Sequence, residues 1–354
     1  MVVFGVIVGL QAWNVPYYAM TPGDATAVGP LISVRGLATD PHHDTILLTD
    51  VYLQSLTAWQ WLTMHLQSHV QFLSADQLVD PGVPADELGA QGFLEMYDSK
   101  QAAEVAALRT LGWRVPARPD GAVVTAVVAP SPARRAGLHV ADRVTAVDGR
   151  RTTSVCAVVA AVHNLAPGTA VQLRVQRARI DAQGVITWGA ATSITLTAAP
   201  PSPTGPSGCP GVRGDARSEL GIGLEDGVHY ALPGRIAIKT NYIGGPSAGL
   251  AMTLSLIDKL SRGSLTGHAI VAATGTMSPN GQVGDVGGVA EKTVAVQRAG
   301  ATIFLVPTVE VATARAAAQP GLRVLGVNTL AQALADLRRL GGAAPVALSA
   351  PAGR

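Results

Sequence analysis

Residues 243–252 read IGGPSAGLAM and place one hydroxyl, that of Ser247, between a glycine-bearing turn and an apolar run. A serine just before an apolar periodic segment predicts a helix cap, because its side-chain oxygen accepts a hydrogen bond from a backbone N–H of the first turn. A nucleophile held at a sharp turn has the same local pattern. This stretch alone leaves both interpretations open.

A nucleophilic serine also needs a base. GPSAG fits the G-x-S-x-G pattern of α/β-hydrolases, but His268 is the only histidine after Ser247, and Asp258, the only acid between them, falls on the same predicted helix as the serine. A neutral lysine can replace histidine where burial lowers its pKa. The helix predicted by VAEKTVAVQRAG puts Lys292 and Val296 on one apolar stripe. A lysine there either lays its stem along apolar surface or acts as the base.

Length and composition limit the number of domains and the kinds of partner and cofactor. A chain of 354 residues predicts two or three domains, and a charged fraction of 14% with a net charge of +2 offers no polyanion-binding surface, so we expect no nucleic-acid partner. His65 and His69 have helical i, i+4 spacing, but HLQSH lacks the glutamate of a metalloprotease helix, and we expect neither metal nor cofactor. Cys156 and Cys209 either pair in an oxidising compartment or remain two unrelated thiols.

The first residues, MVVFGVIVGLQAW, form an uncharged apolar run that is shorter than the roughly 20 residues of a membrane-spanning helix. A buried strand has the same composition. The outer end of a membrane anchor is the other interpretation, and the aromatic residues Trp13, Tyr17 and Tyr18 then suit the membrane interface.

After a mixed region over 30–111, which includes a strand-like ILLTDVYL and a helix-like SKQAAEVAALRTLG, the pattern changes to short strands at Gly121. The run GAVVTAVV, SPARRAGL, DRVTAVDGR, a helix-like SVCAVVAAVHN and APGTAVQLRV resembles a PDZ domain of the kind found in bacterial proteases. This resemblance implies capture of extended peptides by strand addition beside a helix. It assigns the peptide groove to these residues: Leu111, Gly112, Trp113, Val155, Val158, Val159 and Val162.

Residues 200–217 read PPSPTGPSGCPGVRGDAR and indicate a linker, because such a composition has little apolar surface to bury. The block that follows alternates helix-like and strand-like segments, which predicts an α/β domain. Its stretches GGPSAGLAMTLSLID and TGTMSPNGQVGDVGGVAEKTVAVQRAGATIFLVP resemble the serine and lysine motifs of the Lon peptidase family, in the same order and separation.

The Lon resemblance implies catalytic roles. Ser247 is then the nucleophile, Lys292 the general base and Thr274 the hydroxyl beside the lysine, with Gly245 and Pro246 shaping the turn. Many Lon enzymes have an acid where this chain has Gly244, so activation of the serine must differ here. The family often forms hexameric rings.

Taken over nearly its whole length, the chain resembles the membrane-anchored, PDZ-containing Lon-like serine proteases of bacteria, the YlbL type. That resemblance implies an endopeptidase acting on proteins or peptides, with its domains outside the cytoplasmic membrane. The chain has no G-x-x-x-x-G-K-[ST] loop, so we expect cleavage without ATP hydrolysis by this chain. The alternative is a PDZ scaffold whose Lon-like domain does not cut.

The expected fold is α+β and multidomain. Its predicted parts are an anchor or signal segment (1–18), a small α+β domain (19–110), a β-rich PDZ-like domain (111–199), the linker (200–217), a Lon-like α/β peptidase domain (218–341) and a flexible tail (342–354).

Overall fold

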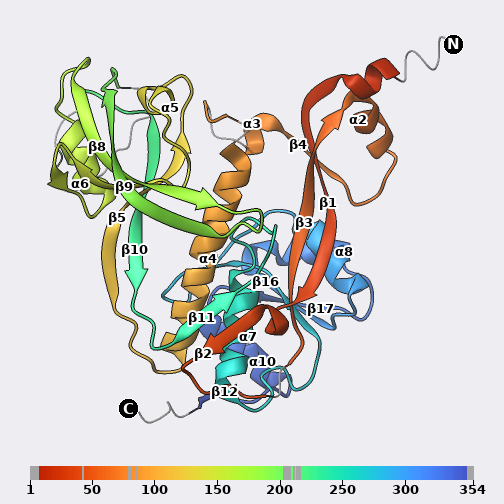
Figure 1. The fold of residues 1–354 in the computed structure, drawn as a ribbon. Coiled ribbons are helices and arrows are strands. Elements are labelled where there is room, and N and C mark those ends of the chain that lie inside the picture. Colours follow the sequence, from red (N-terminus) through yellow and green to blue (C-terminus); the bar gives the residue numbers. More distant parts are fainter. Residues whose placement is uncertain are drawn as a thin grey trace.

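The structure is a computed structural model that describes the chain except residues 1–7, 42–43, 79–81, 85–86, 202–208, 210–211, 213–216 and 349–354. Two larger sheets organise it, one for each of the two bodies in Figure 1. Both bodies mix helices and strands, so the predicted α+β multidomain class is confirmed.

The first body is a six-stranded sheet in the order β17-β16-β13-β3-β1-β4. Strands β3, β13, β16 and β17 run parallel, whereas β1 and β4 are antiparallel to their neighbours. The strands are β1 (Asn14–Ala27), β3 (Ile46–Thr57), β4 (Gln71–Ser74), β13 (Val271–Ala273), β16 (Ile303–Pro307) and β17 (Arg323–Val327).

Helices cover both faces of this sheet. On one face, α4, α7 and α10 bury a core that includes Leu48 of β3 and Leu250 of α7. On the other face, α8 and α9 pack over Leu47 and Phe304. The helices of this body are α2 (Ala58–Met64), α3 (Ala75–Leu78), α4 (Leu88–Thr110), α7 (Gly249–Leu260), α8 (Val289–Arg298), α9 (Val311–Ala317) and α10 (Leu330–Arg339), with the short turns η1 (Gly29–Leu31) and η3 (Thr308–Glu310).

The second body is an antiparallel sheet in the order β10-β5-β6-β8-β9, with β7 paired to β6. Helices α5 (Pro132–Arg135) and α6 (Val155–Val162) accompany it. Its strands are β5 (Ala117–Val127), β6 (Arg143–Val147), β7 (Arg150–Arg151), β8 (Ala170–Ile180), β9 (Ile186–Thr197) and β10 (Ile222–Tyr230).

Three small pairs complete the fold. They are β2 (Ile32–Arg35) with β11 (Arg235–Ile238), β12 (Ser261–Arg262) with β18 (Val346–Ala347), and β14 (Thr276–Met277) with β15 (Val283–Gly284).

The boundaries differ from those expected. The segment 19–110 is not a separate domain, because its strands β1, β3 and β4 complete the sheet of the C-terminal body. The β-rich body is therefore inserted between α4 and β11, and it takes β10 from the region assigned to the peptidase domain. Part of the expected flexible tail is ordered, since β18 pairs with β12.

The first described residues do not form the buried strand that was one interpretation of the N-terminal apolar run. Residues 8–12 are helical and largely exposed, and β1 then carries Tyr17 and Tyr18. Among the described residues, no helix has both the length and the hydropathy needed to cross a membrane.

Cys156 of α6 and Cys209 of the Pro-rich segment form a disulfide, which decides between the two interpretations of these thiols. The bond ties the helix to the segment that leads into β10, and Ser218 adds a second link by donating a hydrogen bond to the carbonyl of Val162 at 3.0 Å. These contacts hold α6 beside β10.

Candidate active site

Ser247 lies in the turn that precedes α7, and it is not the helix cap. The cap position belongs to Ala248, and α7 begins at Gly249 without a side-chain cap. Within the described part of the chain, the Ser247 hydroxyl makes no hydrogen bond, whereas its carbonyl accepts one from the N–H of Gly275 at 2.9 Å and one from Thr274 Oγ1 at 3.2 Å. The main chain of Ser247 is thus fixed, and its hydroxyl is not used for structure.

Helix α4 holds the same turn from the other side. The N–H of Gly245 donates to the carbonyl of Gly92 at 2.7 Å, and buried Ser99 donates to the carbonyl of Pro246 at 3.0 Å. Gly245 has a φ of 85°, a left-handed conformation that glycine adopts without strain. The turn that contains Ser247 is therefore bonded on both sides, to α4 and to the segment after β13.

This packing also explains Gly244. A Cβ added there would lie 3.2 Å from the backbone of Gly92, closer than ordinary van der Waals contact. A side chain at position 244 would require α4 or the turn to shift by a few tenths of an ångström. The packing of α4 on this turn therefore favours glycine at the place where many Lon enzymes have an acid before GPSAG.

Lys292 is buried on α8, with 3% of its surface exposed. Burial lowers the pKa of its amine from 10.5 to about 8, while the carboxylates of Asp50, Glu310 and Glu291 act in the opposite direction. In the described structure Lys292 Nζ has neither a hydrogen bond nor an ion pair closer than 4 Å. An amine in this environment is available as a base near neutral pH.

Thr274, at the end of β13, connects the Ser247 turn to the central sheet. Thr274, fully buried, follows β13, and its N–H donates to Leu305 of β16 at 2.9 Å while its hydroxyl contacts Ser247. Helix α7 packs on β3 from one face of the sheet and α8 packs on β3 from the other. The structure brings Ser247 and Thr274 into contact, and the pairing of Ser247 with Lys292 stays a prediction.

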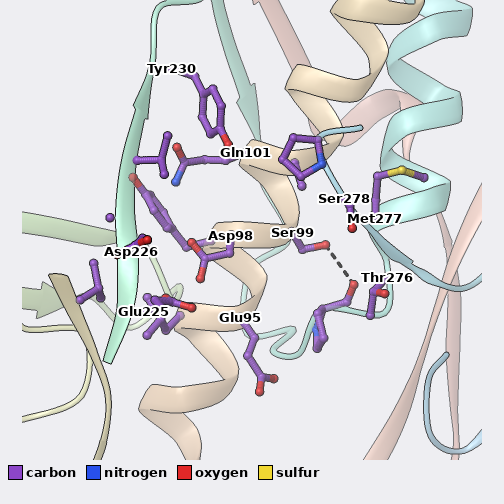
Figure 2. Close-up of a pocket in the computed structure, with 18 of the residues that line it drawn as sticks. Glu95, Asp98, Ser99, Gln101, Glu225, Asp226, Tyr230, Thr276, Met277 and Ser278 are labelled. Atoms are coloured by element: carbon purple, nitrogen blue, oxygen red, sulfur yellow. Dashed lines mark hydrogen bonds between the residues drawn. The ribbon is translucent and has the colours of Figure 1, made fainter. Parts of the chain in front are cut away.

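A cavity of about 360 Å³ opens beside the turn that contains Ser247. Figure 2 shows α4 on one side of it and β10 on the other, with the segment after β13 closing the third side. Pro246 lies in its wall. Because β10 belongs to the inserted body, the cavity is shared between the two bodies.

Carboxylates line this cavity. Asp98 of α4 and Glu225 of β10 are hydrogen-bonded, and burial together with the neighbouring charge of Glu225 raises the pKa of Asp98 to about 8. Burial also raises the pKa of Glu225 and of Glu95. At neutral pH the Asp98–Glu225 pair therefore shares a proton across the contact between the two bodies.

Only some of the residues predicted to form the peptide groove lie on or beside α6. Leu111, Gly112 and Trp113 close the last turn of α4, where the N–H of Trp113 donates to the carbonyl of Leu108 and the ring packs near Leu260 of α7. They belong to the packing of α4 against α7 and not to α6. The apolar-Gly-apolar pattern that suggested a peptide loop also suits a helix end, and Gly112 has the positive φ of that role.

The valines of the groove do lie on α6. Val158 and Val162 are buried in the core of the inserted body, whereas Val155 and Val159 are half-buried. Helix α6 contacts β5, β6 and β10, and of these strands β10 lies at the edge of the sheet. Sequence reasoning missed β10 because it follows the Pro-rich segment, although the pattern LGIGLE at 220–225 is also an apolar-Gly-apolar stretch.

Comparisons with known proteins match two regions of the chain. Residues 109–183 match the family model of the PDZ domain, and residues 227–335 match that of the Lon protease (S16) C-terminal proteolytic domain. A Lon protease of Clostridioides difficile is 44% identical over 63 residues, 18% of this chain and 8% of that protein. A Lon protease of Frankia alni is 41% identical over 91 residues, 25% of this chain and 10% of that protein.

The chain thus aligns with about a tenth or less of these relatives' length. Among solved structures, the PDZ domain of an SdrC-like protein from Listeria monocytogenes is 19% identical and covers 30% of this chain and 87% of that one, with a TM-score of 0.22. The second domain of another Listeria protein is 20% identical and covers 30% and 85%, also with a TM-score of 0.22. By its two family matches, the chain combines a PDZ-type region with a proteolytic region of the Lon type.

Proposed function

We propose that this protein is an ATP-independent serine endopeptidase in which Ser247 attacks the scissile carbonyl and neutral Lys292 takes its proton. The observation that carries the proposal is the buried amine of Lys292, whose pKa of about 8 suits a general base at physiological pH. The matched proteolytic region contains both residues. Ser247 is suited to attack because its hydroxyl has no structural partner among the described residues.

The chemistry proceeds through an acyl-enzyme. Ser247 Oγ bonds to the substrate carbonyl carbon as its proton moves to Lys292 Nζ, and the resulting ammonium returns that proton to the leaving amine. Water then repeats the sequence and releases the acid. The N–H groups of Ser247 and Ala248 are bonded to no acceptor in the described residues, and at the start of α7 they are placed to donate to the oxyanion.

The PDZ-type body would bind the substrate and hold it near Ser247. An extended peptide added to the edge of β10 would be held beside α6, by the strand that also forms one wall of the cavity next to Pro246. One strand thus serves both the expected capture site and the approach to Ser247. We propose on this basis that the inserted body selects or positions protein substrates.

The pH dependence of cleavage tests the proposed mechanism. Only the neutral amine accepts a proton, so kcat/KM should rise with pH through an apparent pKa near 8, with about a tenth of the maximum at pH 7. The measurement is cleavage of an unfolded, dye-labelled protein by the purified chain without ATP, from pH 6 to 10, with the cut sites identified by mass spectrometry. A profile that is flat over this range contradicts a lysine base.

We further propose that the two bodies lie outside the cytoplasmic membrane, anchored through the N-terminal segment. The Cys156–Cys209 disulfide supports this location, because disulfides persist in oxidising compartments. Alkaline phosphatase fused to the C-terminus should be active in cells, since it needs an oxidising compartment to fold. A fusion that is made in full but shows no phosphatase activity would place the bodies inside the cell.

A further inference from the structure

Asp50 is a half-buried carboxyl on β3 that the mechanism above does not use. Leu48, on the same strand, faces the core beneath α7, whereas Leu47 faces the core beneath α8. Because side chains alternate along a strand, Asp50 points to the α7 side, which is the side of Ser247, whereas α8 lies on the other face. Lys292 therefore has to extend past the end of β13, which pairs with β3 only as far as Leu47, to interact with Asp50. β13 pairs in parallel with β3 through Ala272 and Leu47, so continuing this register brings the segment after β13 alongside Asp50.

A bulge in β1 holds the Asp50 carboxylate. The register between the two strands passes from Pro22 opposite Val51 to Ala25 opposite Thr49, which leaves two residues of β1 facing Asp50. The N–H of the second, Asp24, donates to Asp50 Oδ1 at 2.7 Å. Bulges of this kind redirect side chains and are frequent beside active sites.

The first residue of the bulge has to be glycine. A Cβ at Gly23 would lie 2.1 Å from Asp50 Oδ1, so any side chain there would displace the carboxylate. Tyr52 completes the arrangement by donating its hydroxyl to Asp24 Oδ2 at 2.5 Å. The position of Asp50 is thus built into the turn of β1 and is not a chance orientation of a surface side chain.

Helix α8 begins directly over these strands. A Cβ at Gly288 would meet Met20 of β1 at 2.6 Å and Val51 of β3 at 2.9 Å, and the N–H of Lys292 donates to the Gly288 carbonyl one turn later. Asp50 is the strongest of the three carboxylates that interact with the Lys292 amine.

The other two carboxylates come from different elements. Glu310 belongs to η3 and Glu291 to α8 itself, so Asp50 is the one that the sheet presents to Lys292. Since residue 244 is glycine, the turn of Ser247 contributes no acid of its own there.

We infer that Asp50 is a positioning residue for Lys292: held in the β1 bulge, its carboxylate orients the amine at the end of β13 and stabilises the ammonium formed when Ser247 loses its proton. The catalytic part of this inference rests on the proposed function. The electrostatic interaction between Asp50 and Lys292 does not, and it is measurable without any cleavage.

The test uses Asp50→Asn, which keeps an oxygen for the Asp24 N–H and removes only the charge. The chain has four lysines, so labelling their ε-carbons with 13C gives four resonances, of which Lys292 is the one missing in Lys292→Met. We expect the pKa of Lys292 to fall by roughly 0.5–1 unit in Asp50→Asn. Glu310→Gln, which removes the second carboxylate, should lower it by less.

Cleavage provides the second readout. The rise of kcat/KM with pH should move to lower pH in Asp50→Asn by the same amount, while the plateau rate falls, on the order of tenfold, because the ammonium loses its counter-charge. Asp50→Glu, which keeps the charge, should restore the Lys292 pKa more nearly than Asp50→Asn.

Two results would overturn the inference: a Lys292 pKa that is unchanged or raised in Asp50→Asn, or a fall no larger than that in Glu310→Gln. A Lys292 pKa that shifts as expected in a chain that never cleaves would instead contradict the proposed function and leave the contact established. Far-UV circular dichroism of each variant shows whether the fold is retained, and Gly23→Ala, which displaces the carboxylate without removing it, should reproduce the fall of the Lys292 pKa.

Discussion

Replacing Ser247 with alanine should abolish peptide-bond cleavage, with a fall of at least about 10⁴-fold, because the variant lacks the hydroxyl that forms the acyl-enzyme in the proposed mechanism. The fold should be unaffected. In the described structure the Ser247 hydroxyl bonds to nothing, and the contacts that fix the turn use its carbonyl and the carbonyl of Pro246. Melting temperature and peptide binding by the PDZ-type body should therefore match those of the parent.

Ser255 offers a matched control for this experiment. It lies on the same helix, α7, and its buried hydroxyl also has no hydrogen-bond partner in the described structure. Ser255→Ala makes the same chemical change two turns away and should leave cleavage close to that of the parent. Equal losses in both variants would point to a general effect on α7 and not to a nucleophile.

The same experiment separates the two functional classes. Cleavage that persists undiminished in Ser247→Ala would eliminate this serine as the nucleophile. A parent chain that binds peptides at the β10 edge but cuts no unfolded protein at any pH would favour a PDZ scaffold.

Local pattern was sufficient to predict the elements that carry Ser247 and Lys292. A hydroxyl before an apolar run and a lysine on an apolar stripe are features of single helices, and the structure has α7 and α8 at these places. The burial of Lys292 follows from its stripe, since Val289 and Val296 face the same core. Such periodicity extends over ten residues and needs no knowledge of the rest of the fold.

Long-range pairing was not predictable in this way. Ile46 of β3 pairs with Val271 of β13, more than 200 residues later in the chain, and no local pattern reports that register. The segment 19–110 therefore seemed a separate domain, and Asp50 had no visible relation to Lys292. The contact of Gly92 with the Ser247 turn was hidden for the same reason.

Replacing Lys292 with methionine should also abolish cleavage, and it should change stability in a pH-dependent manner. The folded-state pKa of about 8 lies below the ordinary lysine value of 10.5, so the folded protein binds this proton more weakly than the unfolded chain does. The stability that the neutral amine provides is fully present above pH 10.5, and it is lost as the pH falls through about 8. The cost at neutral pH, about 3 kcal/mol, follows from 2.5 pKa units at 1.36 kcal/mol each.

Methionine removes that cost while filling a similar volume, so Lys292→Met should be more stable than the parent at pH 7. The gain should be smaller than 3 kcal/mol, because Asp50 keeps its charge and loses the cation that favours it. Urea unfolding at pH 7 and at pH 10 measures the difference, which should shrink at the higher pH, because pH 10 is close to the unfolded-state pKa of 10.5 and losing the proton on folding then costs little. Lys259→Met, on α7, is the control: Lys259 donates to the carbonyl of Gly29 and is not part of the proposed dyad. An advantage of Lys292→Met that does not depend on pH would show that the gain comes from packing, and the buried amine would then not have the lowered pKa on which the mechanism depends.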